Sequence, residues 1–92
     1  MVVKYYYSSV SSNLEIKKNQ QKIEMILDSK KIAFVKIDVA ADEDAKKRMR
    51  ELMENPSAIP PQLFNDDTYC GDNDAFEEAI ECERLEEFLK LK

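Results

Sequence analysis

Hydrophobic residues recur along this chain with two different periods, which together predict eight secondary-structure elements. Runs of β-forming residues predict strands at Val2–Tyr7, Ile32–Val39, Pro61–Asn65 and Thr68–Cys70. Apolar residues three and four positions apart predict four helices, with inward positions at Ile16, Ile23, Ile26 and Leu27, at Ala45, Met49, Leu52 and Met53, at Phe76, Ala79 and Ile80, and at Leu85, Phe88 and Leu89. The order is strand, helix, strand, helix, strand, strand, helix, helix.

Polar residues mark where these helices begin. Ser12 and Glu15 have the spacing of a capping box, so we expect the first helix to run from there to about Lys30. Asp42 opens the second helix, and Asp74 is expected to cap the third.

The order of the elements predicts an α/β fold. A βαβ unit followed by a ββα unit gives a four-stranded mixed sheet with helices on both faces. The apolar run Ile32–Val39 is typical of a parallel strand covered on both faces. Tyr5, Tyr6 and Tyr7 are expected in the core and at its rim, rather than as a stacking platform. Ninety-two residues, 43% of them apolar, suffice for one domain, residues 1–92.

Charge and composition exclude several classes of function. The net charge is -5 and the pI is near 4.8, so we expect no binding to nucleic acid. The basic run Lys46–Arg48 is flanked by acids and indicates a solvated helix face. Apolar runs never exceed four residues and no secretory signal is visible, so we expect no membrane insertion. We expect a monomer in the cytoplasm, with access to the nucleus.

Backbone constraint is concentrated between Ile59 and Asp72, which hold two of the three prolines and the only glycine. A proline before an apolar strand is a common setting for a cis peptide bond. Gly71 before acidic residues indicates a turn into a helix N-terminus, where backbone N–H groups favour an anion. These features predict a ligand-facing end of the sheet.

Four separated motifs, together with this order of elements, carry a resemblance to a known family. They are Leu14–Gln21, Pro60–Phe64, Tyr69–Asp72 and Glu87–Leu89, and they resemble the short members of the SH3-domain-binding glutamic-acid-rich-like proteins. The resemblance spans essentially the whole chain. It implies a thioredoxin-like fold of the glutaredoxin type without glutaredoxin chemistry, and a role in redox regulation or signalling through protein contacts.

The residues agree with a loss of catalysis. Glutaredoxins need a thiolate at the N-terminus of the first helix, where the helix dipole lowers its pKa. The matching stretch, Ser8–Asn13, contains hydroxyls and no sulfur, and the chain has no histidine. We therefore expect no enzyme activity, no catalytic residue and no metal site.

Glutathione is the ligand that the resemblance suggests, but two residues oppose it. Pro60 precedes the proline that opens the strand, and it has no N–H to offer the tripeptide. The carboxylate of Asp72 is expected to repel the γ-glutamyl carboxylate. We expect weak binding or none, and hence no cofactor.

The leading hypothesis is a non-catalytic adaptor or modulator that acts through protein–protein contacts. Its predicted partner surface comprises Ser11, Ser12, Ile59, Pro60, Pro61, Gln62, Cys70, Gly71 and Asp72. Ala58–Pro61 lacks the Pro-x-x-Pro pattern of an SH3 ligand, whereas Pro60–Phe64 fits the Pro-Pro-x-x-Phe form of some EVH1 ligands. Because the fold needs Leu63 and Phe64 in the sheet, structural prolines are the favoured interpretation.

The cysteines leave an alternative open. Cys70 is the redox candidate, because it lies at the same end of the sheet as the lost active site. It is either glutathionylated or in mixed disulfides, or it is simply a buried small hydrophobe. Cys82 is expected to pack between the last two helices. A disulfide between them stays open, although free thiols are the default in a reducing compartment. A purely structural subunit or homodimer is a third possibility.

Overall fold

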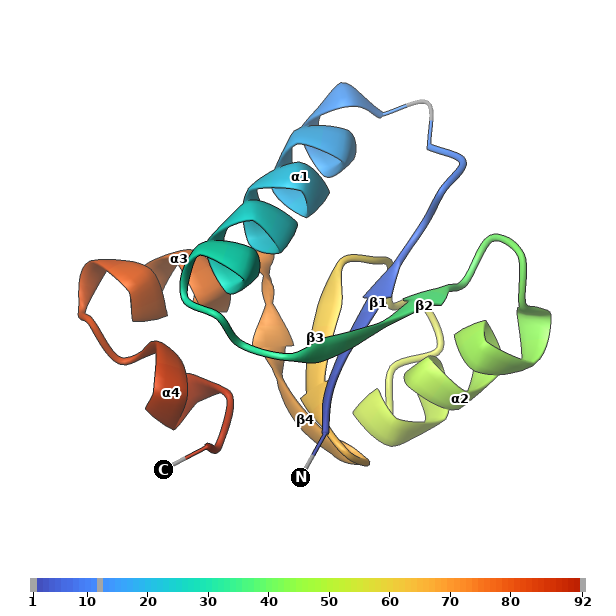
Figure 1. The fold of residues 1–92 in the computed structure, drawn as a ribbon. Helices are drawn as coiled ribbons and strands as arrows, with labels where there is room; N and C mark the ends of the chain where they lie inside the picture. Colours follow the sequence, from blue (N-terminus) through green and yellow to red (C-terminus); the bar gives the residue numbers. More distant parts are fainter. Residues whose placement is uncertain (1, 12, 92) are drawn as a thin grey trace.

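The computed structural model describes residues 2–11 and 13–91 and has the predicted order of elements (Figure 1). The elements are β1 (Val3–Tyr7), α1 (Leu14–Ser29), β2 (Phe34–Asp38), α2 (Glu43–Met53), β3 (Gln62–Asn65), β4 (Thr68–Asp72), α3 (Asn73–Glu81) and α4 (Leu85–Phe88). The strands lie in the order β2-β1-β3-β4. Strand β1 pairs in parallel with β2 and antiparallel with β3, and β3 pairs antiparallel with β4. The predicted four-stranded mixed sheet is confirmed.

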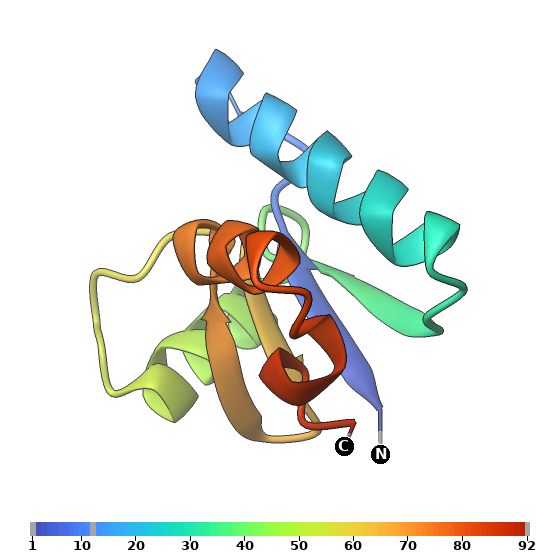
Figure 2. The same cartoon turned by 90° about the vertical axis from the view of Figure 1, so that its left-hand side faces the viewer.

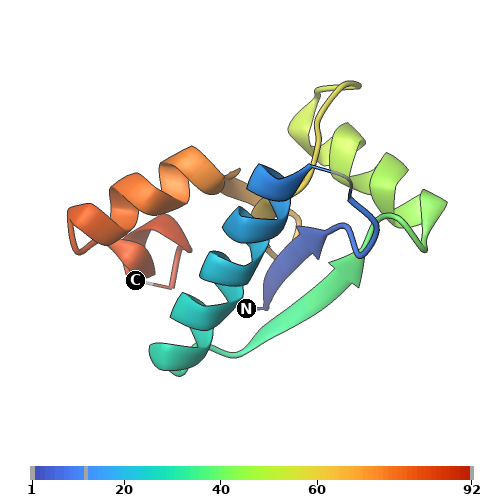
Figure 3. The same cartoon turned by 90° about the horizontal axis from the view of Figure 1, so that it is seen from above.

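Helices cover both faces of the sheet, as Figures 2 and 3 show: α1, α3 and α4 lie on one face and α2 on the other. The core is accordingly divided in two. The cluster under α1, α3 and α4 comprises Val3, Tyr5, Ile23, Leu27, Leu63, Phe76, Leu85 and Leu89, and the cluster under α2 comprises Tyr6, Val39, Met49, Ala58 and Phe64. Tyr5 and Tyr6 are 0% and 3% exposed, so the expectation that these tyrosines form the core is confirmed. None of the described helices is long and apolar enough to cross a membrane.

Strand β2 differs from its prediction. It lies at the edge of the sheet and pairs only with β1. Val35 is 48% exposed and Phe34 is only partly buried, so the expected coverage on both faces was wrong. An apolar run does not distinguish a central strand from an edge strand, because strand order is decided by tertiary pairing.

Two helices are capped by a residue other than the predicted one. The side chain of Asn13 accepts from the backbone N–H groups of the first turn of α1, and Ser12, the predicted cap, lies outside the described residues. Asp72, rather than Asp74, caps α3 by accepting from the N–H of Ala75 at 3.0 Å. Strand β4 runs directly into α3, so the last extended residue takes the capping position.

Each of the four helices ends in a paired turn of the Schellman type, with a left-handed residue just beyond the last turn. In α2, for example, the N–H of Glu54 donates to the carbonyl of Glu51, and the N–H of Asn55 donates to that of Arg50. The left-handed residues are Lys31, Glu54, Glu83 and Lys90, with φ between 54° and 58°. Glycine is the usual residue at such positions, because a Cβ atom is disfavoured there.

Replacing Glu54 with glycine should therefore stabilise the protein. Glycine adopts this conformation without a steric penalty, so we expect Glu54→Gly to raise the free energy of unfolding by about 0.5–1 kcal/mol. Glu51→Gly, inside α2 on the exposed face, is the matched control and should lower it by about 1 kcal/mol. Urea unfolding followed by circular dichroism measures both, and equal losses in the two variants would contradict the prediction.

Candidate functional site

The loop between β1 and α1, which contains the predicted site residue Ser11, is held by two buried or partly buried side chains. The amide of Gln20 pairs with both backbone groups of Ser8: Ser8 N–H donates to Oε1 at 2.9 Å, and Nε2 donates to the carbonyl at 3.0 Å. Ser9 N–H donates to Oδ1 of Asp38 at 3.1 Å. Hydrogen bonding from Ser9 lowers the pKa of the Asp38 carboxyl. Hydrogen bonds to the side chains of Gln20 and Asp38 therefore fix the position of this loop.

Ser11 remains with the start of α1. Its hydroxyl accepts from the N–H of Asn13 at 3.2 Å and lies 3.4 Å from the carbonyl of the same residue. Figures 1 and 2 show this end of α1 standing clear of the sheet, away from the loop that enters β3. The hydrogen bonds of Ser11 thus lie within the start of α1 and not with the predicted proline surface.

The loop before β3 packs inward rather than presenting a ligand. The Pro60–Pro61 peptide bond is cis, Pro60 is partly buried and Pro61 is buried. The side chain of Gln62, itself buried, folds back so that Nε2 donates to the carbonyl of Ile59 at 2.7 Å. Its Oε1 accepts from the hydroxyl of Tyr69 at 2.9 Å. Within this loop only Ile59, 58% exposed, presents a large apolar side chain to solvent.

The EVH1-ligand interpretation requires an accessible Phe64. This side chain is 0% exposed, and its ring lies against those of Tyr6 and Tyr69 with centroids 5.0 and 5.3 Å away. Leu63 is fully buried on the opposite face. Presenting Phe64 to a partner would therefore require β3 to leave the sheet.

Gly71 and Asp72 bring β4 into contact with the last helices. A Cβ atom on Gly71 would lie 2.6 Å from Cε1 of Phe88 and 2.9 Å from Cβ of Ala75, so only glycine permits this approach. The carboxylate of Asp72, which was expected to face an incoming ligand, instead bonds to an N–H of its own helix. One of the backbone N–H groups at the start of α3 that could bind an anion is thus already bonded to the carboxylate of Asp72. Beside it, Oδ1 of the buried Asn73 has no hydrogen-bond partner among the described residues.

Cys70 lies in an irregularity of β4, between residues that pair with Leu63 and Phe64. Its thiol is partly buried against the cluster under α1, α3 and α4, and Sγ lies 3.8 Å from the carbonyl of Thr68. Burial raises the pKa of the Cys70 thiol, although the Lys90 ammonium acts in the opposite direction. The thiol is therefore near the end of α4 and poorly ionised, rather than turned toward the prolines.

Cys82 was expected to pack between the last two helices, and this was wrong. It is exposed at the end of α3, and both cysteines are free. The next residue, Glu83, is left-handed, so the chain turns and the helical spacing no longer predicts which side faces inward.

Neither of two clefts in the described chain involves the predicted site. One, of about 470 Å³, lies along α2 and the residues that follow it. The other, of about 710 Å³, lies between the end of α1 and the α3–α4 pair. Among the described residues, no cluster of acidic and cysteine side chains could hold a metal ion.

These features define the class of fold to which the chain belongs. A sheet of order β2-β1-β3-β4, with α1 and α3 on one face and α2 on the other, is a thioredoxin-like α/β fold of the glutaredoxin type. A family model described as SH3-binding, glutamic acid-rich protein matches residues 1–92. The chain belongs to this family, as its resemblance predicted.

One relative and two solved structures give the closeness of the match. The SH3 domain-binding glutamic acid-rich protein homolog of Drosophila melanogaster is 48% identical over 105 residues, which cover 99% of this chain and 65% of that protein. The chain thus spans about two thirds of that relative's length. A structure of actin interacting protein 5 from C. albicans has a TM-score of 0.79 at 25% identity, with 99% of this chain and 90% of that chain covered. A mutant of actin interacting protein 5 has a TM-score of 0.76 at 21% identity, with 96% and 86% covered.

The close contact at Gly71 predicts a specific loss of stability. Gly71→Ala must displace the Phe88 ring, so we expect the free energy of unfolding to fall by about 1–3 kcal/mol. In a Phe88→Leu background the clashing ring atoms are absent, and the same substitution should cost less. A double-mutant cycle by urea unfolding measures the difference, and equal costs in both backgrounds would show that the ring is not responsible.

The two thiols should differ in reactivity. We expect iodoacetamide to modify Cys82 roughly tenfold or more faster than Cys70, because Cys82 is exposed and burial raises the pKa of Cys70. Peptide mass spectrometry of the native protein follows each site, and Cys82→Ser should leave only the slow reaction. Faster labelling of Cys70 would contradict its placement.

Proposed function

We propose that this protein is a non-catalytic glutaredoxin-like module that modulates partner proteins by direct contact. The observation that carries the proposal is the absence of sulfur from Ser8–Asn13, where a glutaredoxin keeps its nucleophile. A serine hydroxyl cannot enter a disulfide, and no histidine is present to activate it. What remains is a glutaredoxin-like scaffold for recognition.

The relatives support a contact function. The family description names SH3 binding, and the structure that is 25% identical is named for its interaction with actin. An SH3 domain has no Pro-x-x-Pro segment to bind in Ala58–Pro61, and Pro61 is buried. Actin is therefore the first partner to test. Because free thiols are the default in a reducing compartment, we propose that this activity is in the cytoplasm, with access to the nucleus.

Glutathione binding is the main competing function, and the contacts at this site oppose it. Pro60 lacks the N–H that an extended tripeptide would need, and Asp72 already bonds to the first turn of α3. We propose that glutathione binds weakly or not at all. Mixed disulfides at Cys70 are disfavoured for the same physical reason as alkylation: the thiol is partly buried and its pKa is raised.

Amide NMR of the isotope-labelled, reduced protein tests both functions. Reduced and oxidised glutathione should leave the spectrum unchanged, and monomeric actin should produce saturable broadening. Cys70→Ser should bind actin with the same affinity, because the proposal requires no thiol.

The opposite pattern would overturn the proposal. Saturable glutathione shifts at Leu63 and Gly71, together with glutathione-dependent disulfide reduction that Cys70→Ser abolishes, would establish a residual redox protein. An unchanged spectrum with actin would remove actin as a partner, while silence toward glutathione would still support the non-catalytic assignment.

A further inference from the structure

Strand β2 has a free edge. It pairs with β1 on one side only, and Figure 3 shows it at the margin of the sheet. The N–H of Val39, just beyond the strand, donates to the carbonyl of Tyr7 at 2.8 Å, so the odd-numbered residues of β2 turn their backbone groups toward β1. The N–H and C=O groups of Phe34 and Lys36 therefore point away from the sheet, and none of the described residues pairs with them.

The two edges of the sheet differ in how they are protected against a further strand. At the other edge, β4 has an irregularity between the residues that pair with Leu63 and Phe64, and such bulges disturb the pairing of an added strand. Strand β2 follows β1 without a register shift and contains no proline. Its edge is therefore regular enough to pair again.

The charged side chains of β2 are held by the chain itself. A lysine on an edge strand commonly prevents further pairing, because its charge would be buried by the new strand. Here Nζ of Lys36 lies 2.6 Å from Oε1 of Glu24 and 4.6 Å from the centroid of the Tyr7 ring, over the face that α1 covers. The carboxylate of Asp38 accepts from backbone N–H groups, among them that of Ser9 at 3.1 Å.

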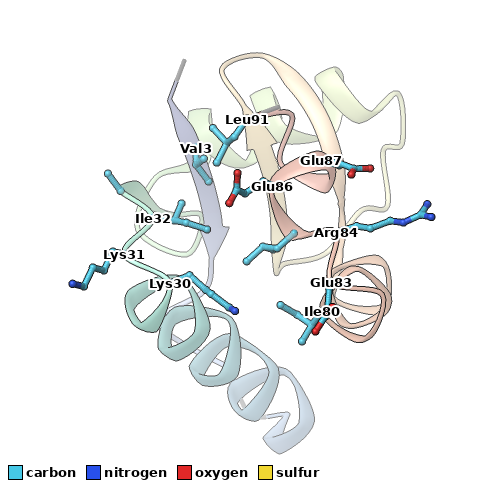
Figure 4. A pocket seen from close by; sticks show the side chains of 12 residues that line it. Val3, Lys30, Lys31, Ile32, Ile80, Glu83, Arg84, Glu86, Glu87 and Leu91 are labelled. Atoms are coloured by element: carbon cyan, nitrogen blue, oxygen red, sulfur yellow. The ribbon is translucent and has the colours of Figure 1, made fainter.

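The free edge identifies its occupant more closely than the larger cleft does. That cleft is lined by three basic and three acidic side chains, those of Lys30, Lys31, Arg84, Glu83, Glu86 and Glu87 (Figure 4). Its apolar residues Val3 and Leu85 are only 2% and 7% exposed, so neither charge nor open apolar surface selects a partner there. A row of unpaired backbone groups, in contrast, is matched by another extended main chain.

We propose that the edge of β2 binds an extended segment of a partner protein, which adds a fifth strand to the sheet. Main-chain hydrogen bonds at Phe34 and Lys36 supply the affinity. Val35 faces the opposite side of the sheet from Phe34 and is 48% exposed, so a β-branched side chain across from it would cover apolar surface. The inference rests on the proposed contact function and names its surface.

A second copy of the chain fits this edge less well. If two copies of β2 paired antiparallel over their whole length, Lys36 would lie opposite the same residue of the other copy. Like charges directly opposite each other destabilise a sheet. The net charge of -5 on each copy opposes the approach as well. The inferred occupant is therefore a segment of a different protein.

Amide hydrogen exchange tests the inference on the isotope-labelled 92-residue protein. The probe is a capped peptide of about seven residues, slightly longer than β2, with alternating valine and threonine and a lysine at each end. We expect the N–H groups of Phe34 and Lys36 to exchange rapidly in the free protein and at least about tenfold more slowly with saturating peptide. Those of Val35 and Ile37 face β1 and should be protected in both states.

A matched peptide isolates the main-chain bonds. The same peptide with N-methyl groups on two adjacent central residues keeps its side chains and its charge but loses a donor on each edge. It should bind much more weakly than the parent peptide, because the edge of β2 is recognised through backbone groups.

Two substitutions at one position locate the site on the protein. Lys36→Pro removes an outward N–H without removing a bond to β1, and proline is tolerated at such an edge position. It should weaken binding at least about tenfold, which corresponds to about 1.4 kcal/mol. Lys36→Thr removes the same side chain but keeps the N–H, so it should lose much less. Circular dichroism confirms that each variant folds. If Lys36→Pro does not fold, the N-methylated peptide tests the same bonds on the parent protein.

Several outcomes would overturn the inference. Equal binding of the N-methylated peptide, or equal losses in Lys36→Pro and Lys36→Thr, would show that the main chain of β2 is not used. Protection confined to β4 would place the peptide at the other edge. Concentration-dependent sedimentation that Lys36→Pro abolishes would make a second copy the occupant.

Actin separates this inference from the proposed function. If actin binds Lys36→Pro and the parent equally, the edge assignment fails while the contact function stands. If the peptide protects Lys36 although actin does not bind, the edge assignment stands and only actin is removed as the partner.

Discussion

Strand β1 is paired on both edges and buried on both faces, and the rest of the structure depends on this position. Tyr5 and Tyr6 are adjacent, so their side chains fill opposite layers and each layer needs its own helices. Burial, and next the Glu24 carboxylate, raise the pKa of Tyr5, so its hydroxyl stays protonated and donates to the carbonyl of Gln20 at 3.2 Å. The side chain of the same glutamine holds Ser8. Through Tyr5 and Gln20, strand β1 thereby helps to fix the position of α1 over the sheet and the path of the loop before it.

The sequence predicts the type and order of every element, because each has a clear period of apolar residues. It does not predict which strand lies at the edge of the sheet, because that depends on strand pairing, or which of two similar residues caps a helix. The run Ile32–Val39 has the composition of a central strand, yet it lies at an edge. Asp72 and Asp74 are equally good caps by type, and Asp72 takes the role only because β4 enters α3 without a loop.

The candidate site was less predictable than the fold. The resemblance to a family predicts which residues share a surface, but it does not predict the direction of their side chains. Ser11 bonds within the start of α1, and the thiol of Cys70 lies near Lys90. The larger cleft carries no sequence motif, since its walls come from helix ends far apart in the chain. A glycine at these positions would have indicated where the helices end, but the left-handed residues are Lys31 and Glu83.

Polar side chains at the proline end of the sheet bond to the chain's own backbone. Gln20, Gln62 and Asp72 bond there to backbone groups of Ser8, Ile59 and Ala75, so a peptide ligand could pair with those groups only by replacing internal hydrogen bonds. Such an exchange gives little net free energy, because a typical intramolecular hydrogen bond already contributes about 1 kcal/mol. The chain's own side chains thus satisfy much of the polar backbone around the predicted site.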